Sequence, residues 1–284
     1  MKAAVLIPNT KNDKDLSVTE RVARKLNSLG ITGYIDSSVE HCPTSLLKYD
    51  VFPDSCELLI VIGGDGSVID ASHYAIERNI PVMGINLGKV GYLSEVEPDN
   101  LDLFDKLVSG EYTVNERMLL TVSVQGNRPD GGALSRLAVN DIVISHDSYL
   151  GIADFRLEDS LGNSIKYRAD GVILSTPQGS TAYSLSAGGP VIAHDVDCIL
   201  ATPVCPHSFF NRSVLFNAGE TLKITNVGEP PLNISIDGRL AMTLERGDSC
   251  AVRTADKKMK MLSFANNSMF TNLFRKMRIM EDIK

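Results

Sequence analysis

Short apolar runs alternate with stretches of helical periodicity along the first third of the chain. Four runs are typical of buried strands: residues 3–7, 31–35, 58–62 and 80–85. A helix is predicted to begin at Ser17, which forms a capping-box pair with Glu20, and to end at Gly30. Residues 101–108 have the same periodicity and stop at Gly110. Strands and helices in this repeating order predict a parallel sheet with helices on both faces.

From about Met118 the pattern changes to short β-type segments that are separated by turn residues. The predicted strands are residues 119–124, 137–144, 152–157, 172–175, 213–216, 222–225, 232–236 and 250–254. Asp237-Gly238 lies between two β-type runs and is typical of a type I′ hairpin turn. Many short strands at this spacing predict an all-β sandwich or barrel.

We therefore expect two domains, an α/β domain over residues 1–117 and a β-sandwich domain over residues 118–266. The tail returns to helical spacing, and its basic side lies at Arg275, Lys276 and Arg278. A basic amphipathic helix can bind membranes. Because this basic cluster is short, we favour docking of residues 267–284 against the first domain.

Composition narrows the class of protein. The chain has 284 residues, of which 43% are hydrophobic, so it has material for one large core or two ordinary ones. Its formal net charge of −7, with scattered Lys and Arg, excludes a typical nucleic-acid binder. No apolar run approaches the roughly 18 residues that cross a bilayer, and no signal-peptide pattern follows Met1. We expect a soluble, cytoplasmic protein without a membrane partner.

Cysteines and histidines give no sign of a disulfide framework or a zinc site. The five cysteines are odd in number and show no C-x-x-C spacing, so we expect reduced thiols. The five histidines are dispersed and are expected at the surface or in packing. The sequence therefore predicts no metal ligands among the side chains.

The most specific local pattern is Gly63-Gly64-Asp65-Gly66-Ser67, which follows an apolar strand and precedes a helical repeat. Glycines let the backbone approach a ligand closely, and Ser67 with Asp70 is a plausible N-cap. A strand, a glycine turn and a helix N-terminus together form an anion site. The alternative is a tight turn in which Asp65 only caps backbone N–H groups. The helix is expected to bury Val68, Ala71, Ser72, Ala75 and Ile76.

A second group of polar residues interrupts the β-type region. Asn140-Asp141 stands inside an apolar run, and residues 167–171 precede another. Residues 175–186 concentrate hydroxyl groups around Tyr183. Hydroxyls and carboxylates can bind sugar diols and a purine edge, while a tyrosine ring can stack on a base. The alternatives are a plain turn at Asn140-Asp141 and a Ser/Thr-rich loop that satisfies its own backbone.

Taken together, these segments resemble bacterial NAD kinases from about residue 55 to residue 240. The resemblance is carried by residues 63–67, 84–88 with 91–93, 140–141, 168–171 and 175–190. The glycine turn alone is shared with diacylglycerol-type lipid kinases and phosphofructokinases, whereas the long segment 175–190 is specific. The resemblance implies an α/β nucleotide-binding domain with a parallel sheet, followed by a β-sandwich domain.

The reaction implied by the resemblance moves the γ-phosphoryl group of ATP to the 2′-hydroxyl of the adenosine ribose of NAD. Asp65 would accept the hydroxyl proton. The phosphates would be bound by Gly63, Gly64, Gly66 and Ser67. Mg²⁺, or another divalent cation, would be bound through the ATP phosphates rather than by a dedicated protein site. Most of the catalysis would come from positioning and charge neutralisation.

The resemblance also implies the residues that contact NAD. Asn140 and Asp141 would hold adenine or ribose groups, and Asp170 with Arg168 would meet the nicotinamide half. The full set is Asp65, Gly66, Tyr92, Asn140, Asp141, Arg168, Asp170, Thr181, Ala182, Tyr183, Ser184, Leu185, Ser186 and Asp237. Tyr92 stands where the family commonly has Phe, and Arg239 stands where many members have Gln. The Arg239 departure leaves the ligand contacts near Asp237 in question.

The family is commonly oligomeric, so a homodimer or homotetramer is expected. The residues leave two other functions open: a lipid or sugar kinase that shares the glycine turn, and a catalytically silent NAD-binding module. They also leave open NAD against NADH as acceptor, ATP against polyphosphate as donor, and inhibition by NADPH.

Overall fold

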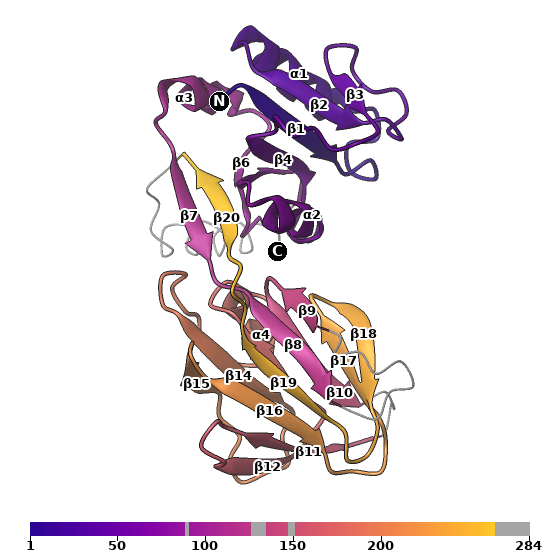
Figure 1. Cartoon of the computed structure of the whole chain (residues 1–284), viewed down its shortest axis with the longest axis vertical. Coiled ribbons are helices and arrows are strands. Elements are labelled where there is room, and N and C mark those ends of the chain that lie inside the picture. Colours follow the sequence, from indigo (N-terminus) through magenta and orange to yellow (C-terminus); the bar gives the residue numbers. More distant parts are fainter. Residues whose placement is uncertain (89–90, 126–134, 147–150, 265–284) are drawn as a thin grey trace, which may run out of the picture. The chain divides into compact units, whose positions relative to one another are not determined.

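Figure 1 shows a computed structural model of the chain, which describes residues 1–88, 91–125, 135–146 and 151–264. The chain divides into two compact units, Met1–Glu116 with Met259–Lys284, and Arg117–Lys258. Strand β20 (Met259–Ser263) pairs in the sheet of the first unit, whereas the sequence placed these residues in the second domain. The helix predicted over residues 268–283 lies outside the described residues.

The first unit contains a sheet with the strand order β3-β2-β1-β4-β5-β20-β7, and β6 pairs with β5. Besides β20, its strands are β1 (Ala3–Pro8), β2 (Thr32–Asp36), β3 (Leu47–Tyr49), β4 (Leu58–Gly63), β5 (Val82–Asn86), β6 (Ser94–Val96) and β7 (Thr113–Arg117). Strands β1 to β5 pair in parallel, as predicted. The chain leaves β1 toward β2 and leaves β4 toward β5, so β1 and β4 meet at the switch point where ligands of such sheets bind.

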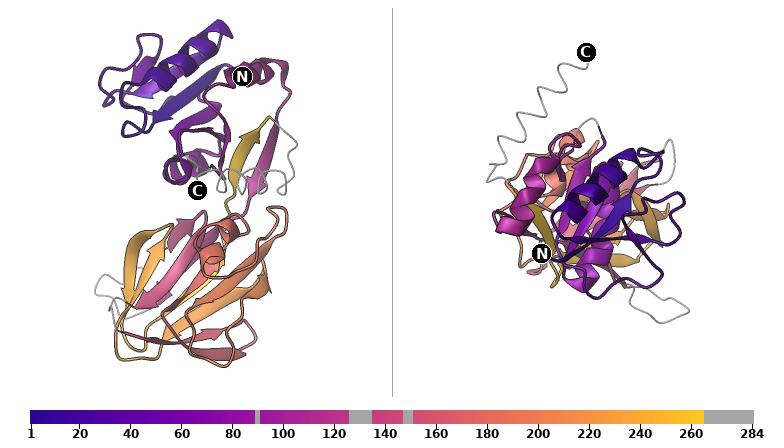
Figure 2. Two further views of the ribbon diagram at one scale, coloured as in Figure 1. Left: turned by 180° about the vertical axis from the view of Figure 1, so that it is seen from behind. Right: turned by 90° about the horizontal axis from the view of Figure 1, so that it is seen from above.

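Helices α1 (Ser17–Ser28) and α2 (Asp65–Arg78) connect these strands, and η1 (Leu101–Phe104) continues into α3 (Asp105–Ser109). Helix α1 packs on β2, and α2 packs on β4 and β5; Figure 2 shows the same unit from behind. The capping box predicted at Ser17 is wrong. The carboxylate of Asp13 instead accepts the N–H groups of Val18 (3.1 Å) and Thr19 (2.9 Å), because Leu16 adopts a left-handed conformation that brings Asp13 back to the helix.

The second unit consists of two antiparallel six-stranded sheets in the described chain, with the orders β15-β14-β13-β10-β17-β18 and β12-β11-β16-β19-β8-β9. Its first six strands are β8 (Leu120–Gln125), β9 (Ser135–Ala138), β10 (Asp141–His146), β11 (Ala153–Glu158), β12 (Ser164–Ala169) and β13 (Gly171–Ser175). The other six are β14 (Cys198–Val204), β15 (Val214–Asn217), β16 (Thr221–Asn226), β17 (Leu232–Ile236), β18 (Arg239–Leu244) and β19 (Ser249–Thr254). One hydrophobic cluster contains residues from both sheets, which confirms the predicted sandwich.

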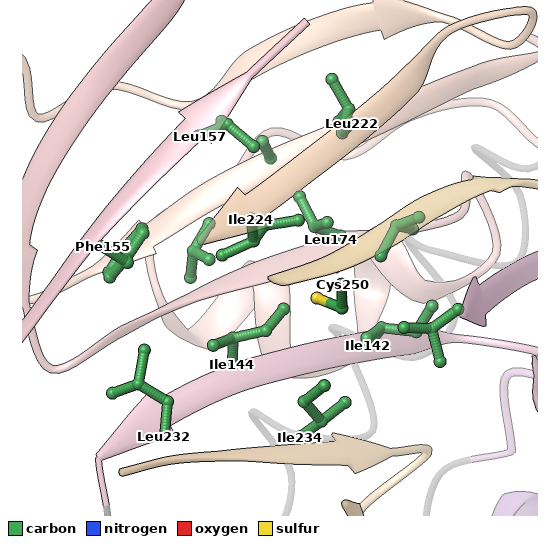
Figure 3. Close-up of a cluster of buried hydrophobic side chains, with 14 of the residues drawn as sticks. Ile142, Ile144, Phe155, Leu157, Leu174, Leu222, Ile224, Leu232, Ile234 and Cys250 are labelled. Carbon is green, nitrogen blue, oxygen red and sulfur yellow. The ribbon is translucent and has the colours of Figure 1, made fainter. Parts of the chain in front are cut away.

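Figure 3 shows the interior of this sandwich. Ile142, Ile144 and Leu174 come from one sheet, and Phe155 and Ile224 come from the other. The side chain of Phe155 stacks on Tyr167, with ring centroids 5.4 Å apart. This packed core supports the loops at the ends of the strands, where the polar segments of the sequence are found. No helix in the described residues is long and apolar enough to cross a membrane.

Candidate active site

The glycine turn joins β4, whose residues are all buried, to helix α2. A Cβ atom at Gly63 would come within 2.7 Å of Ser67 Oγ, so this glycine permits close packing of the strand against the helix. A Cβ atom at Gly64 or Gly66 would meet no atom of the described chain within 4 Å. These two positions leave the helix N-terminus open toward an anion.

Helix α2 begins at Asp65 with Gly64 as its N-cap, so the predicted N-cap at Ser67 is wrong. Ser67 lies in the first turn, where its hydroxyl accepts the Asn9 Nδ2–H at 2.7 Å. The burial of Val68, Ala71, Ser72, Ala75 and Ile76 is confirmed. The helix therefore buries the face that its periodicity predicted, but it begins two residues earlier than Ser67.

Asp65 is half-buried, and its carboxylate accepts the backbone N–H groups of Tyr92 (2.7 Å) and Leu93 (3.0 Å). The side chain thus caps backbone N–H groups, as the alternative interpretation of the glycine turn predicted. Each carboxylate oxygen has further lone-pair capacity, so this capping leaves room to accept a hydroxyl proton. Burial, and to a lesser extent the charge of Asp65, raises the pKa of the Tyr92 phenol, which stays a hydrogen-bond donor at neutral pH.

The segment after β5 folds against the glycine turn. Leu87 N–H donates to Gly63 O at 3.1 Å, and Gly88 N–H donates to Asn86 Oδ1 at 3.0 Å. A Cβ atom at Gly91 would lie 3.0 Å from Asn86 Cγ and from Ser94 O. The glycines of this segment therefore hold the Tyr92 and Leu93 N–H groups within reach of Asp65.

In the second unit, Asp237 and Gly238 form the hairpin turn between β17 and β18, with φ angles of 47° and 79°. These values confirm the predicted turn of type I′ character. The Asp237 carboxylate also accepts the backbone N–H groups of Val139 (2.9 Å), Asn140 (2.7 Å) and Asp141 (3.1 Å). Asp237 therefore fixes the polar interruption between β9 and β10.

The backbone at residues 139–140 is also bonded to a third segment, which contains Thr176. Thr176 Oγ1 donates to Val139 O at 2.8 Å, and Thr176 N–H donates to Asn140 O at 2.9 Å. A Cβ atom at Gly179 would lie only 2.0 Å from Asn140 O, so the backbone segments are in direct contact there. The structure thus brings together residues 139–141, 176–179 and 237–238, which are far apart in the sequence.

Asp141 is only 5% exposed, and this burial distinguishes it from the other carboxyl groups of the candidate site. Burial, and then the charge of Asp237, raises the pKa of Asp141 to about 7. Near neutral pH this group therefore exists in both protonation states, and it can donate or accept a hydrogen bond. A strongly shifted carboxyl at the start of a strand, next to a constrained polar turn, is typical of a ligand site.

The raised pKa predicts how Asp141 affects stability. In the unfolded chain the pKa of Asp141 is near 3.8. As the pH rises from there to about 7, the unfolded chain loses this proton while the folded chain keeps it, so the free energy of unfolding falls over this range. Asp141→Asn is expected to raise the free energy of unfolding by roughly 2–4 kcal/mol at pH 8, and by less at pH 5. Urea denaturation at both pH values measures this, and an equal effect at both would contradict the assignment.

The hydroxyl-rich segment contains η2 (Gly179–Thr181) and α4 (Tyr183–Ser186), and it divides into two sets of side chains. Ser180 Oγ donates to Pro177 O at 2.7 Å, and Ser184 Oγ lies 2.9 Å from Thr202 Oγ1 in the interior. For Ser180 the alternative of a loop that satisfies its own backbone is the better description, whereas the Ser184 hydroxyl is bonded to a side chain of strand β14. Thr181 and Ala182 are half-buried, whereas Tyr183, Leu185 and Ser186 are exposed.

Arg168 and Asp170 lie at the junction of β12 and β13. Arg168 is exposed, and Asp170 Oδ1 lies 3.6 Å from His146 Nε2. A hydrogen bond to Asp170 raises the pKa of the Cys205 thiol. Sequence reasoning missed His146 and Cys205, because only the pairing of β13 with β10 and β14 brings them to Asp170. Within the described residues, no group of three or more His, Cys, Asp or Glu side chains could hold a metal ion.

Two family models match the chain: the ATP-NAD kinase N-terminal domain over residues 5–112 and the ATP-NAD kinase C-terminal domain over residues 139–264. The NAD kinase of Lachnoclostridium phytofermentans is 33% identical over 95% of this chain and 96% of its own length. The NAD kinase of Geobacter sulfurreducens is 36% identical over 80% of each chain.

Two solved structures share the fold. Yeast NADH kinase complexed with NADH has a TM-score of 0.83 at 20% identity, covering 98% of this chain and 88% of the yeast chain. An NAD kinase from Archaeoglobus fulgidus in complex with ATP has a TM-score of 0.73 at 22% identity, covering 98% and 99%. The likeness extends over both units of the chain.

Proposed function

Since this chain belongs to the NAD kinase family, we propose that it transfers the γ-phosphoryl group of ATP to the 2′-hydroxyl of the adenosine ribose of NAD. The observation that carries this function is the match of both kinase domain models along one chain, with curated relatives named NAD kinase covering nearly its whole length. A lipid or sugar kinase would share the glycine turn alone.

Asp65 is the proposed general base. The ribose 2′-oxygen forms a bond to the γ-phosphorus as the bond from that phosphorus to the β,γ-bridging oxygen breaks, and ADP leaves. The hydroxyl proton passes to a carboxylate oxygen of Asp65. Its hydrogen bonds to Tyr92 and Leu93 N–H fix the side chain in one orientation. Positioning of this kind supports a loose transition state, in which little covalent chemistry falls to the protein.

The donor phosphates would bind at the N-terminus of α2. The open positions Gly64 and Gly66, with the Ser67 hydroxyl, place polar groups there without a side chain in the way. The positive end of the helix dipole favours the same charge. Gly63 contributes by allowing the close contact of strand and helix.

A divalent cation, Mg²⁺ in our proposal, would be held by the donor phosphates. The proposal assigns this cation no protein ligands, because Mg²⁺ usually keeps waters and substrate phosphates as its ligands. EDTA is expected to lower the rate of NADP formation by at least about 100-fold, and excess Mg²⁺ should restore it. Thermal stabilisation by NAD should persist in EDTA, and its loss would indicate a metal held by the protein.

In the second unit, Asn140 and Asp141 are proposed to bind adenine or ribose groups, and Tyr183 offers an exposed ring for stacking. Thr181, Ala182, Leu185 and Ser186 complete this surface. Arg168 and Asp170 are proposed for the nicotinamide half. Ser184 is assigned a packing role here, because its hydroxyl is bonded inside to Thr202. A homodimer or homotetramer in the cytoplasm remains part of the proposal.

Asp237 is proposed to position this surface through its three backbone contacts. Asp237→Asn keeps the shape but replaces one acceptor oxygen by a donor, so at least one backbone N–H loses its partner. The KM for NAD is expected to rise about tenfold with a smaller change in kcat, because a lost charged hydrogen bond is worth about 1.5–3 kcal/mol. The exposed Asp195→Asn is the matched control. Steady-state kinetics with equal effects in both variants would contradict the role.

The acceptor class can be tested by ligand-induced thermal stabilisation. A ligand that binds only the folded state raises the melting temperature in proportion to its affinity and concentration. NAD is expected to stabilise the protein, whereas diacylglycerol and fructose 6-phosphate are not. Stabilisation by either of the latter two, without an effect of NAD, would favour a lipid or sugar kinase.

A further inference from the structure

A cavity of about 370 Å³ opens in the first unit, away from every residue assigned above to phosphate or NAD. Pro8, Asp36 and Tyr49 line it, and each is the last residue of its strand, β1, β2 or β3. Phe52, Tyr74 and Arg78 also line it. The volume lies in the range of small-molecule sites, and the carboxyl ends of parallel strands are where such sheets bind ligands.

The lining suits a flat aromatic group. The rings of Tyr49 and Phe52 meet edge to face with centroids 5.7 Å apart, and the Arg78 guanidinium lies 4.4 Å from the Phe52 centroid. Tyr74, which is 57% exposed, adds a third ring to the lining. Burial raises the pKa of Tyr49 to about 12, so its phenol remains a donor. A heteroaromatic base can stack on such rings and bond to this donor.

The same cavity offers acceptors for a sugar. Asp36 lies at the end of β2, and its Oδ1 accepts the Ser38 N–H at 2.9 Å, which fixes the carboxylate. Asp50, also in the lining, accepts the Ser37 hydroxyl at 2.5 Å. An acidic side chain at the end of the second strand is the position that binds a ribose diol in related α/β sheets.

Strand β1, whose end lines the cavity, is followed by a residue that is bonded to the glycine turn. Asn9 follows Pro8, and it donates from its backbone N–H to Ile62 O at 2.8 Å and from Nδ2 to Ser67 Oγ at 2.7 Å. Helix α2 also spans both places, since Tyr74 lies nine residues after Asp65, about 14 Å along the axis. A ligand in the cavity could therefore extend phosphates toward the N-terminus of α2.

We propose that this cavity holds the adenosine of the phosphoryl donor. The proposal rests on the kinase function above, and it makes the enzyme select a nucleoside triphosphate over bare polyphosphate. The base lies against Tyr49, Phe52 and Tyr74, the ribose faces Asp36, and the phosphates lead to Gly64 and Gly66. NAD has its own adenosine, but the contacts proposed for it are Asn140, Asp141, Thr181, Ala182, Tyr183, Leu185 and Ser186, none of which lines this cavity.

The kinetic test uses Phe52→Ala and Arg78→Gln, with the fully exposed Phe209→Ala as a matched aromatic control. Phe52→Ala removes one stacking platform, and Arg78→Gln removes the guanidinium that lies over that ring, so each is expected to raise the KM for ATP, in Phe52→Ala by about tenfold or more. The KM for NAD should be unchanged in both variants, and Phe209→Ala should behave as wild type. An unchanged KM for ATP, or a rise in the KM for NAD instead, would overturn the assignment. Absence of NADP formation by the wild type would overturn the kinase function itself.

A binding test does not depend on turnover and also covers variants of low activity. Thermal stabilisation by ATP is compared with that by inorganic tripolyphosphate, at equal concentration with Mg²⁺. The wild type should be stabilised more by ATP, and Phe52→Ala should reduce the ATP effect to that of tripolyphosphate. Equal stabilisation of the wild type by both probes, or an ATP effect that survives Phe52→Ala, would exclude adenosine from the cavity.

Discussion

Asp65→Asn is expected to lower kcat for NADP formation by about 10²- to 10⁴-fold, the usual worth of a general base. The amide cannot take the proton of the ribose hydroxyl, although it occupies the same volume as the carboxylate. The KM for NAD should change little, because the other proposed NAD contacts remain. Steady-state kinetics, with NADP measured by an NADP-specific dehydrogenase, gives both constants.

The capping role of Asp65 provides the competing explanation for such a loss. Since Asn offers one acceptor oxygen, either Tyr92 or Leu93 N–H loses its partner, and some stability should be lost. A purely structural role would lower the melting temperature and raise the KM for NAD while kcat fell only slightly. Asp70→Asn, on the exposed side of the same helix, is the matched control and should keep its activity. Turnover of Asp65→Asn within about tenfold of wild type would exclude the base.

Gly179→Ala is expected to have the second largest effect, a fall of about 10²-fold in kcat/KM for NAD. The new Cβ would lie 2.0 Å from Asn140 O, so the backbone of one segment must move. That movement displaces the Asn140–Asp141 segment, which Thr176 and Asp237 otherwise hold in place. Overpacking of this kind also lowers the free energy of unfolding by about 1–3 kcal/mol.

Gly219→Ala in the same unit is the control for this substitution. Its Cβ would approach only Asn217 Oδ1, at 3.3 Å, and that side chain can move. Kinetic constants and urea denaturation should therefore match the wild type. If Gly179→Ala binds NAD as tightly as Gly219→Ala, the Asn140–Asp141 segment is not part of the NAD site.

The fold could be predicted where one periodicity dominates. The helix after the glycine turn has apolar residues at helical spacing, and its buried face was predicted residue by residue. Strand β18 (Arg239–Leu244) was implied by the hairpin turn but was not among the predicted strands, because four of its six side chains are exposed. The run 137–144 was predicted as one strand but forms two, β9 and β10. The side chains of Asp237 and Thr176 bond to backbone groups at residues 139–141, which therefore do not pair with a neighbouring strand as in a continuous strand.

The site could be predicted only as a set of residues, not as an arrangement. The glycine turn and the hydroxyl-rich segment are local patterns and were found in the sequence. The contact of Asp237 with Asn140 joins residues 97 positions apart, and the contact of Asp65 with Tyr92 joins residues 27 apart. Such contacts depend on strand order and register, which no local pattern encodes. The cap at Asp13 was missed for a related reason, because a left-handed Leu16 brings it back to the helix.

The most direct measurement is NADP formation by the purified chain with NAD, ATP and Mg²⁺, detected with an NADP-specific dehydrogenase. We predict that NADP accumulates when all three are present and that omission of any one prevents it. NADH in place of NAD, and polyphosphate in place of ATP, define the acceptor and the donor in the same assay. Failure to form any NADP with every acceptor and donor would contradict the assignment of this chain as an NAD kinase.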